Sequence, residues 1–252
     1  MKYTIDTDAR TMTQEGDAVL HLFSKESFDI LARLWTDVGW VRKYSYAFSW
    51  MGRPIIQLPD DMVRTAEAIW ETQPDVIVET GIAHGGSLVF YASLFAAIGR
   101  GRVIGVDIEI RQHNLAAIKA HPMYGRITLI EGNSTSAETI GRVREQIRPG
   151  EKVMVILDSN HEKDHVAKEM AAYGELVTAG CYLLVADGIM QHVAGMPRTG
   201  PDWTWNNPKS AIADFLAARS DFKRVPPPRP FDESQQVPDC THHPDGWLRR
   251  IA

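Results

Sequence analysis

One stretch of the 252-residue sequence decides the fold: Asp75-Val-Ile-Val-Glu-Thr-Gly-Ile-Ala-His-Gly-Gly-Ser-Leu88. Three β-branched residues, Val76 to Val78, predict a buried parallel strand that ends at Glu79. The glycines that follow predict a tight turn, and an apolar run up to Ile98 predicts a helix. This arrangement suits a nucleotide-like ligand, because glycine lets the backbone approach the ligand and a helix N-terminus offers unpaired N–H groups. An ordinary tight turn is the alternative.

A second strand is predicted for Arg102-Val-Ile-Gly-Val-Asp-Ile108, with Asp107 at its end. One strand–helix–strand unit separates Glu79 from Asp107. An acidic residue at this place commonly binds the ribose hydroxyls of a dinucleotide or of S-adenosylmethionine. The alternative is a surface aspartate that caps the next helix.

The alternation of strands and helices continues along the chain. Strands are predicted at 126–130, 152–157 and 181–186, and helices at 110–120, 135–147 and 162–177. This pattern predicts an α/β fold with a mostly parallel central sheet and helices on both faces. Such sheets bind ligands beyond the carboxyl ends of their strands. We therefore expect one cleft to contain the polar residues at the predicted strand ends, namely Glu79, Asp107, Asn133, Asp158 and Asp187.

Composition narrows the class of protein. Apolar residues make up 44% and charged residues 23%, as in globular proteins, and the net charge of −5 gives no reason to expect nucleic acid or an anionic membrane as partner. Cys181 and Cys240 make no disulfide framework. The opening MKYTIDTDAR lacks the apolar core of a signal peptide, and no run is long enough to cross a bilayer. A cytoplasmic location is expected.

Two histidine-containing motifs are candidates for metal binding. His161-Glu-Lys-Asp-His165 matches the H-E-x-x-H pattern of zinc proteases, but it starts in a turn just beyond a strand, so we disfavour that function. His161 is a candidate general base or metal neighbour at the mouth of the cleft; a solvated loop histidine is the alternative. Cys240-Thr-His-His243 lacks the rest of a zinc set and is interpreted as a loop.

The flanking segments are less regular. Residues 1–20 predict a mobile or loosely attached arm, and 24–37 a helix. The aromatic segment 39–52 either covers a ligand or partner subunit or packs on the core. The proline- and glycine-rich segment 190–207 is expected to border the cleft as a lid, with Trp203 and Trp205 stacking on a substrate or anchoring the loop.

Several of these runs together resemble the cephalosporin-hydroxylase family, a branch of the S-adenosylmethionine-dependent class I methyltransferases that includes rhamnosyl O-methyltransferases. The resemblance covers about 200 residues in order and implies the Rossmann-like class I methyltransferase fold. Late antiparallel strands near 222–225 and 247–251 would complete it. The matching runs are Trp50-Met-Gly-Arg-Pro-Ile-Ile-Gln-Leu-Pro-Asp-Asp61, Val78-Glu-Thr-Gly-Ile-Ala-His-Gly-Gly-Ser87, Val103-Ile-Gly-Val-Asp-Ile108, Ile130-Glu-Gly-Asn-Ser134, Leu157-Asp-Ser-Asn-His161 and Pro244-Asp-Gly-Trp-Leu-Arg-Arg250.

The resemblance implies roles for the matching residues. Asp158 would face the sulfonium and a divalent metal, Asp187 would be a second metal ligand, and Asp158 and His161 are the implied catalytic residues. The implied cofactor-binding set is Glu79, Gly81, Gly85, Gly86 and Ser87 on the methionine portion, Asp107 on the ribose with Ile108 beside it, Asn133 and Ser134 near the adenine, and Asp158.

Two departures from the family pattern weaken the metal site. Asn160 stands where the family often has aspartate, and Ala186 where it often has glutamate, so two carboxylates are missing. Magnesium prefers oxygen ligands and keeps several waters, so two aspartates could still hold it with lower affinity. The alternative is a dispensable metal site, in which His161 takes the proton of the acceptor hydroxyl.

The sequence therefore predicts a helical and aromatic arm and lid, residues 1–55, and a Rossmann-like S-adenosylmethionine-binding catalytic domain, residues 56–252. The expected activity is O-methylation of a small natural product or glycoside, and the aromatic arm suggests a homo-oligomer. A catalytically silent cofactor-binding partner protein of a biosynthetic pathway is the alternative. A nicotinamide-dependent oxidoreductase is disfavoured, because the turn fits G-x-G-x-x-G poorly.

Overall fold

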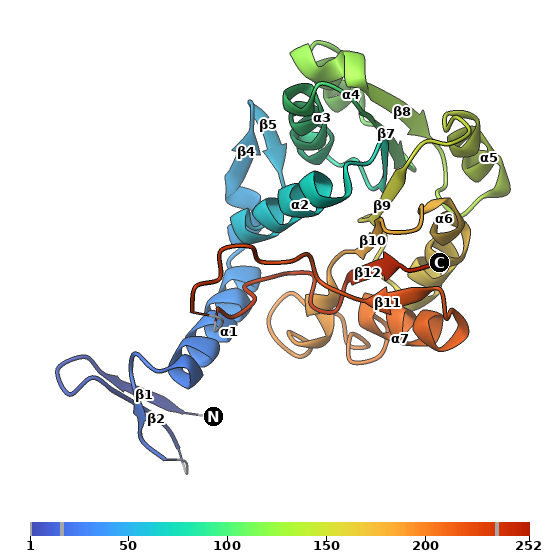
Figure 1. Cartoon of the computed structure of the whole chain (residues 1–252). Coiled ribbons are helices and arrows are strands. Elements are labelled where there is room, and N and C mark those ends of the chain that lie inside the picture. Colours follow the sequence, from blue (N-terminus) through green and yellow to red (C-terminus); the bar gives the residue numbers. More distant parts are fainter. Residues whose placement is uncertain (1, 16–17, 235–236) are drawn as a thin grey trace.

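The computed structural model describes residues 2–15, 18–234 and 237–252 and is organised around a seven-stranded sheet (Figure 1). Strands β6 to β10 run parallel, while β12 is antiparallel to both β10 and β11. The predicted mostly parallel sheet and its late antiparallel strands are confirmed. In spatial order the strands are β11 (Phe222–Arg224), β12 (Trp247–Arg250), β10 (Tyr182–Val185), β9 (Val153–Leu157), β6 (Val76–Thr80), β7 (Arg102–Asp107) and β8 (Ile127–Glu131).

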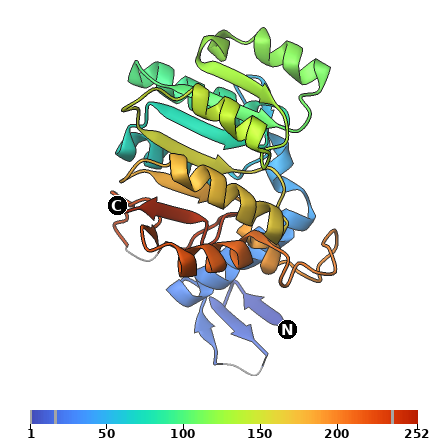
Figure 2. The same cartoon turned by 90° about the vertical axis from the view of Figure 1, so that its right-hand side faces the viewer.

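Helices cover both faces of this sheet, as the alternation of strands and helices predicts. Successive side chains of a strand point to opposite faces, so Ile77 packs with one helical layer and its neighbours Val76 and Val78 with the other. Helices α5 to α7 lie in front of the strands in Figure 2. One layer contains α2 (Pro59–Thr72), α3 (Gly86–Ile98) and α4 (Gln112–Lys119), and the other contains α5 (Ala137–Glu145), α6 (Lys163–Tyr173) and α7 (Pro208–Ala218).

The order of the strands places a crevice at β6. The chain winds outward from β6 to β7 and β8 on one side and to β9 and β10 on the other. In parallel sheets this reversal leaves room for a ligand beyond the carboxyl ends of the two central strands. Here those ends are Thr80 of β6 and Leu157 of β9, which are paired in the ladder. The loops that begin at Gly81 and Asp158 therefore start side by side.

The N-terminal segment differs from its prediction. The described residues form an antiparallel meander of β1 (Tyr3–Asp6), β2 (Thr11–Gln14) and β3 (Leu20–His21), which projects away from the sheet in Figure 1. Short runs rich in threonine, isoleucine and tyrosine favour strands even when they are polar overall. The Asp6 carboxylate closes the turn by accepting hydrogen bonds from two backbone amides. The strands of this segment were not predicted, and its loose attachment to the rest of the molecule stays a prediction.

The aromatic segment is more regular than predicted. Helix α1 (Lys25–Val41) is capped by the Ser24 side chain, which accepts from the Ser27 amide, and is followed by a 3-10 helix, η1 (Tyr44–Ala47). A hairpin of β4 (Phe48–Trp50) and β5 (Arg53–Ile55) then packs on α3: the Trp50 indole donates to the Ser93 hydroxyl at 3.0 Å. The two interpretations of this segment are compatible, because the hairpin both packs on the core and borders the cleft described below.

Among the described residues, no helix has the length and apolar character needed to span a bilayer.

Gly86, in the glycine-rich turn, contacts the β4–β5 hairpin. A Cβ atom at Gly86 would lie 2.1 Å from the carbonyl oxygen of Pro54, whereas a Cβ at Gly141 of α5 would meet nothing within 4 Å. Replacement of Gly86 with alanine should lower the free energy of unfolding by about 1–3 kcal/mol. The control, Gly141→Ala, should raise it by about 0.5–1 kcal/mol, because alanine favours helix. Urea unfolding measures both; equal effects would mean that the Pro54 contact is absent.

Candidate functional site

A cleft of about 240 Å³ opens beyond the carboxyl ends of β6, β9 and β10. The glycine-rich turn after β6 and the loop after β9 form its floor, and Asp187 enters from the end of β10. The remaining walls come from α1, the hairpin and the C-terminal loop. The structure thus brings together several predicted residues from distant parts of the sequence: Gly81, Gly86, Ser87, Asp158, His161 and Asp187.

The glycine-rich turn is shaped by close backbone contacts. Gly81 has a φ of +94°, and a Cβ there would lie 2.0 Å from the carbonyl oxygen of Asp158. Gly85 has a φ of +79°, and a Cβ there would overlap Ile118 of α4. Both positions require glycine, since an L side chain would be strained and would collide. The turn therefore keeps its backbone N–H groups close to the cleft.

Asp107 holds this turn from the neighbouring strand. Its Oδ2 accepts hydrogen bonds from the backbone amides of Ile82 at 2.8 Å and Ala83 at 3.1 Å. Its Oδ1 accepts only from the amide of Glu109, at 3.3 Å, and so keeps capacity for another donor. Ile108 beside it is 70% exposed. The predicted binding of a ribose by Asp107 and Ile108 stays a prediction, but the first shown role of Asp107 is to position the turn.

Glu79 lies behind the cleft and does not line it. Its buried carboxylate accepts hydrogen bonds from the Ser87 hydroxyl at 2.7 Å and the Tyr91 hydroxyl at 3.1 Å. Gln57 in turn donates to the Tyr91 oxygen at 3.4 Å. Burial raises the pKa of Glu79 to about 8, because an ionised carboxylate is poorly solvated there. Direct contact of Glu79 with a cofactor stays a prediction; the structure shows it supporting Ser87.

Three side chains could hold a divalent cation. Asp158, His161 and Asp187 each offer a ligand atom, and these atoms lie within 4.8 Å of one another. His161 Nε2 is 3.4 Å from Asp187 Oδ2. Burial, reinforced by the charges of Asp187 and Glu79, raises the pKa of Asp158 well above its usual value. Crowded carboxylates of this kind are relieved by a cation or a proton, so the donor set fits a metal.

Asn160, one of the two departures from the family pattern, bonds within its own loop. It is exposed, and its side-chain oxygen accepts from the backbone amide of Glu162 at 2.8 Å. The third donor is instead His161, which precedes the helix α6. His165 lies on α6 and faces elsewhere, with Nε2 3.4 Å from Glu169. The two histidines of the H-E-x-x-H run therefore do not share a metal site.

The predicted adenine neighbours lie apart from the cleft. Asn133 is exposed, and its side chain accepts from the backbone amide and the hydroxyl of Thr135. Ser134 is buried, and its hydroxyl lies 3.2 Å from His165 Nε2. Neither residue lines the cleft, so their predicted contact with an adenine ring stays a prediction.

The segment after β10 meets α1, as expected of a lid at the edge of the cleft. The Arg198 guanidinium donates to the backbone carbonyls of Trp40 and Val41, at the end of α1. The ring of Trp203 packs edge-on against Trp40, with centroids 5.8 Å apart, which favours the anchoring role for Trp203. Trp205 is exposed.

Sequence reasoning missed the walls contributed by Gln57 and His242, whereas Trp40 belongs to the aromatic segment that was a candidate cover for a ligand. The Cys240–His243 segment does lack regular structure, but it is bound to α2, because Asp61 accepts hydrogen bonds from the His242 backbone amide and the Thr241 hydroxyl. Two adjacent histidines after a proline-rich loop were the available signal. No local pattern could reveal that they contact a residue about 180 positions earlier.

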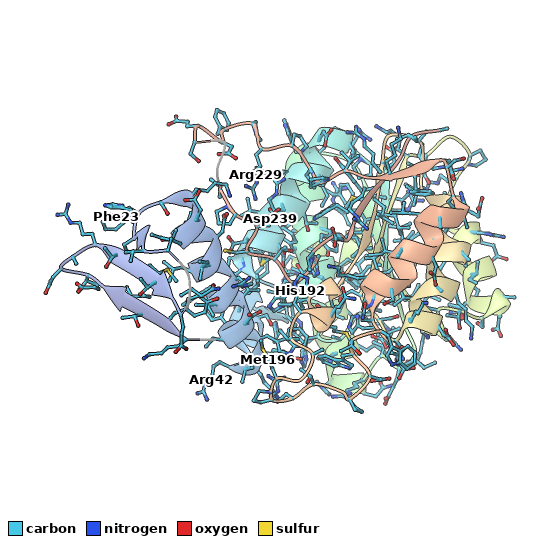
Figure 3. The ribbon with its side chains drawn as sticks, turned by 90° about the horizontal axis from the view of Figure 1, so that it is seen from below. Phe23, Arg42, His192, Met196, Arg229 and Asp239 are labelled. Carbon is cyan, nitrogen blue, oxygen red and sulfur yellow. The ribbon has the colours of Figure 1, made fainter. Side chains whose placement is uncertain are left out.

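This segment separates the cleft from a larger cavity of about 830 Å³. Successive side chains alternate: His242 faces the cleft, whereas Thr241 and His243 face the larger cavity between α1, α2 and the C-terminal loop. The loop carries an ion pair between Arg229 and Asp239, both labelled in Figure 3. His243 Nδ1 also accepts a hydrogen bond from the backbone amide of Asp187 at 3.1 Å, so this segment contacts the end of β10.

The raised pKa of Glu79 predicts a specific dependence of stability on pH. Because the carboxyl holds its proton more tightly in the folded protein, the free energy of unfolding should fall as pH rises from about 4.5 to about 8. Glu79→Gln has nothing to titrate, so its stability relative to the wild type should increase across this window, by at most about 1.4 kcal/mol per pH unit. Urea unfolding at several pH values measures the difference. Glu145→Gln, at an exposed site, is the control, and a pH-independent difference for Glu79→Gln would contradict the assignment.

The chain also matches known proteins. The model of a family described as "Rhamnosyl O-methyltransferase/CmcI" matches residues 42–251. The rhamnosyl O-methyltransferase of Mycobacterium leprae is 35% identical over 156 residues, 60% of this chain and 65% of that protein. Its counterpart in Mycobacterium tuberculosis is 32% identical over 157 residues, 61% of this chain and 62% of that protein. The alignments thus span less than two thirds of the length of these relatives.

Solved structures agree on the fold. An apo-structure of CmcI superposes with a TM-score of 0.56 at 22% identity, covering 82% of this chain and 77% of that one. The O-methyltransferase of Bacillus cereus, in complex with S-adenosylhomocysteine, gives a TM-score of 0.50 at 13% identity, covering 79% and 90%. With the family match over residues 42–251, these likenesses show that the chain belongs to the rhamnosyl O-methyltransferase/CmcI family and has its Rossmann-like fold.

Proposed function

We propose that the protein is an S-adenosylmethionine-dependent O-methyltransferase acting on a hydroxyl group of a small natural product or glycoside. The observation that carries the proposal is one cleft in which a glycine-rich turn lies next to Asp158, His161 and Asp187. Two of the relatives named above are rhamnosyl O-methyltransferases. CmcI has also been solved with magnesium and S-adenosylmethionine, at a TM-score of 0.54 and 23% identity to this chain.

The glycine-rich turn is the proposed cofactor site. Gly81, Gly85 and Gly86 leave room for a ligand against the backbone, and the amides at the start of α3 favour polar groups. Asp107 and Ile108, at the end of the next strand, would extend the site. Bound S-adenosylmethionine supplies an electrophilic methyl group. The task of the chain is to hold the acceptor in line with that methyl group and to keep water out.

The acceptor hydroxyl must also lose its proton, and His161 is the proposed proton acceptor. Asp187, 3.4 Å from Nε2, would orient the imidazole and stabilise its protonated form. Asp158, His161 and Asp187 would hold a divalent cation, which would lower the pKa of a bound hydroxyl. One imidazole nitrogen cannot bind a metal and accept a proton at once. The role of His161 is therefore one or the other in any single state.

A catalytically silent cofactor-binding protein is the less favoured function. Such a protein would need the glycine-rich turn but would gain nothing from keeping three ligating side chains beside it. We also propose that residues 1–55 serve as an arm and lid on a catalytic domain of residues 56–252, because Ser45, Tyr46 and Pro54 line the cleft. Exposed Phe23 and Trp35 on the arm support a homo-oligomer.

The cofactor is tested by calorimetric titration with S-adenosylmethionine and, separately, with NAD, each with and without magnesium. Micromolar binding of S-adenosylmethionine and no binding of NAD are expected. Gly81→Ala should abolish that binding, because its Cβ would displace the Asp158 backbone, while Gly125→Ala, whose Cβ meets nothing within 4 Å, should retain it. Binding of NAD alone, or of neither ligand, would refute the proposed function.

The role of His161 is tested by alanine substitution once an acceptor is found. His161→Ala should lower kcat by about 10²- to 10⁴-fold, the usual contribution of a general base, and should change the Kd of S-adenosylmethionine far less. His113→Ala, on the exposed side of α4, is the matched control. Equal losses in kcat and cofactor affinity would contradict proton transfer by His161. A simultaneous loss of magnesium binding would identify His161 as a metal ligand instead.

A further inference from the structure

Unpaired polar atoms gather at one side of the cleft. Among the described residues, five buried side-chain nitrogen or oxygen atoms have no hydrogen-bond partner. Three of the five belong to residues that line the cleft: Trp40 Nε1, Gln57 Oε1 and His242 Nε2. Burying an unpaired polar atom is unfavourable, and native structures keep few of them. Their concentration around one cleft indicates that a ligand completes their hydrogen bonding.

The three side chains are fixed in place by other contacts. The Gln57 amide nitrogen donates to the Tyr91 hydroxyl, so the Gln57 side-chain oxygen is the atom without a partner. The backbone amide of His242 is bound by Asp61, and its ring packs on Trp40 with centroids 5.3 Å apart. Gln57 and His242 are only 5% and 4% exposed. Such fixed groups can select a ligand, because little conformational entropy is lost when it binds.

The three segments that carry these atoms lie outside the parallel sheet. Trp40 ends α1, Gln57 precedes α2, and His242 lies in the C-terminal loop. The glycine-rich turn of the proposed cofactor site belongs to the sheet's own β6–α3 connection. These three segments therefore supply walls of the cleft that the glycine-rich turn does not form.

The chemistry of the atoms narrows the class of acceptor. The Trp40 indole needs an acceptor, the Gln57 oxygen needs a donor, and a neutral imidazole offers one of each. Burial lowers the pKa of His242, which favours its neutral form. A hydroxyl group both donates and accepts, whereas an ammonium group cannot accept and a carboxylate cannot donate. The Arg198 guanidinium, a cation that lines the cleft, is already bound to backbone carbonyls and so is not free to pair with an anionic acceptor.

We propose that Trp40, Gln57 and His242 are specificity-determining residues of the acceptor subsite, and that they recognise a neutral acceptor through a hydroxyl group other than the one methylated. The inference rests on the proposed function and adds to it the acceptor's charge, its second hydroxyl group and the residues that select it. Acceptors that carry a single hydroxyl should be poor substrates, because the three polar atoms would stay unpaired.

The test uses the wild-type protein saturated with S-adenosylhomocysteine and titrated with neutral methyl glycosides, beginning with methyl α-L-rhamnoside and its monodeoxy derivatives. At least one glycoside should bind, and one deoxy derivative should bind more weakly. Trp40→Phe, Gln57→Leu and His242→Phe should each weaken glycoside binding by about threefold to tenfold, the range for one neutral hydrogen bond. In Trp40→Phe and His242→Phe, the Kd of S-adenosylhomocysteine should change less than about twofold. Trp70→Phe, at an exposed site on α2, is the matched control.

Thermal unfolding without glycoside separates recognition from a structural role. His242→Phe should leave the midpoint unchanged or raise it, because phenylalanine keeps the ring and removes an unpaired buried nitrogen. A lowered midpoint with unchanged glycoside affinity would overturn the proposal, as would a wild-type complex that binds S-adenosylhomocysteine but none of the glycosides. Failure of the wild type to bind S-adenosylhomocysteine would instead count against the proposed function.

Discussion

The close approach of β6 and β9 at their carboxyl ends is the constraint on which the site depends. Gly81 lies so near the Asp158 carbonyl that a single methyl group would force the two strands apart. The contact places the glycine-rich turn beside Asp158 and His161. Asp107 then fixes the turn from the other side by binding the amides of Ile82 and Ala83. The spacing of these two strands therefore sets the position of the cleft.

A buried network of hydrogen bonds supports the glycine-rich turn. Gln57, Tyr91 and Ser87 all lead to the Glu79 carboxylate, which is sealed from solvent. These hydrogen bonds link the segment before α2 to α3 and β6. One carboxyl group therefore holds together the segment before α2 and the end of β6. Desolvation makes its charge unfavourable, and hydrogen bonds offset only part of that cost. Such a group specifies geometry more than it contributes to stability.

Much of the fold was predictable because the parallel strands are visible in the sequence. Runs such as Val76 to Val78 are buried on both faces, so they form continuous apolar segments that end in polar residues. The rule that strand ends converge correctly placed Asp158 and Asp187 in one cleft. It also placed Glu79, Asp107 and Asn133 there, and these three do not line it. The meander at the N-terminus was missed because it is short and polar. Gln57 and His242 were missed because their place depends on tertiary contacts, such as that of Asp61 with the C-terminal loop, which no local periodicity encodes.

The separate origins of the two halves of the cleft have a consequence for its assembly. The half that contains the glycine-rich turn is built from one uninterrupted stretch, from β6 to Asp187, which includes every parallel strand of the sheet. The opposite half needs α1, the turn before α2 and His242, which is added only after every parallel strand of the sheet. Because synthesis proceeds from the N-terminus, His242 is the last part of the cleft to be made, after the glycine-rich turn and after α1 and the turn before α2. Until His242 meets Asp61, the cleft is open on that side and the larger cavity is continuous with it.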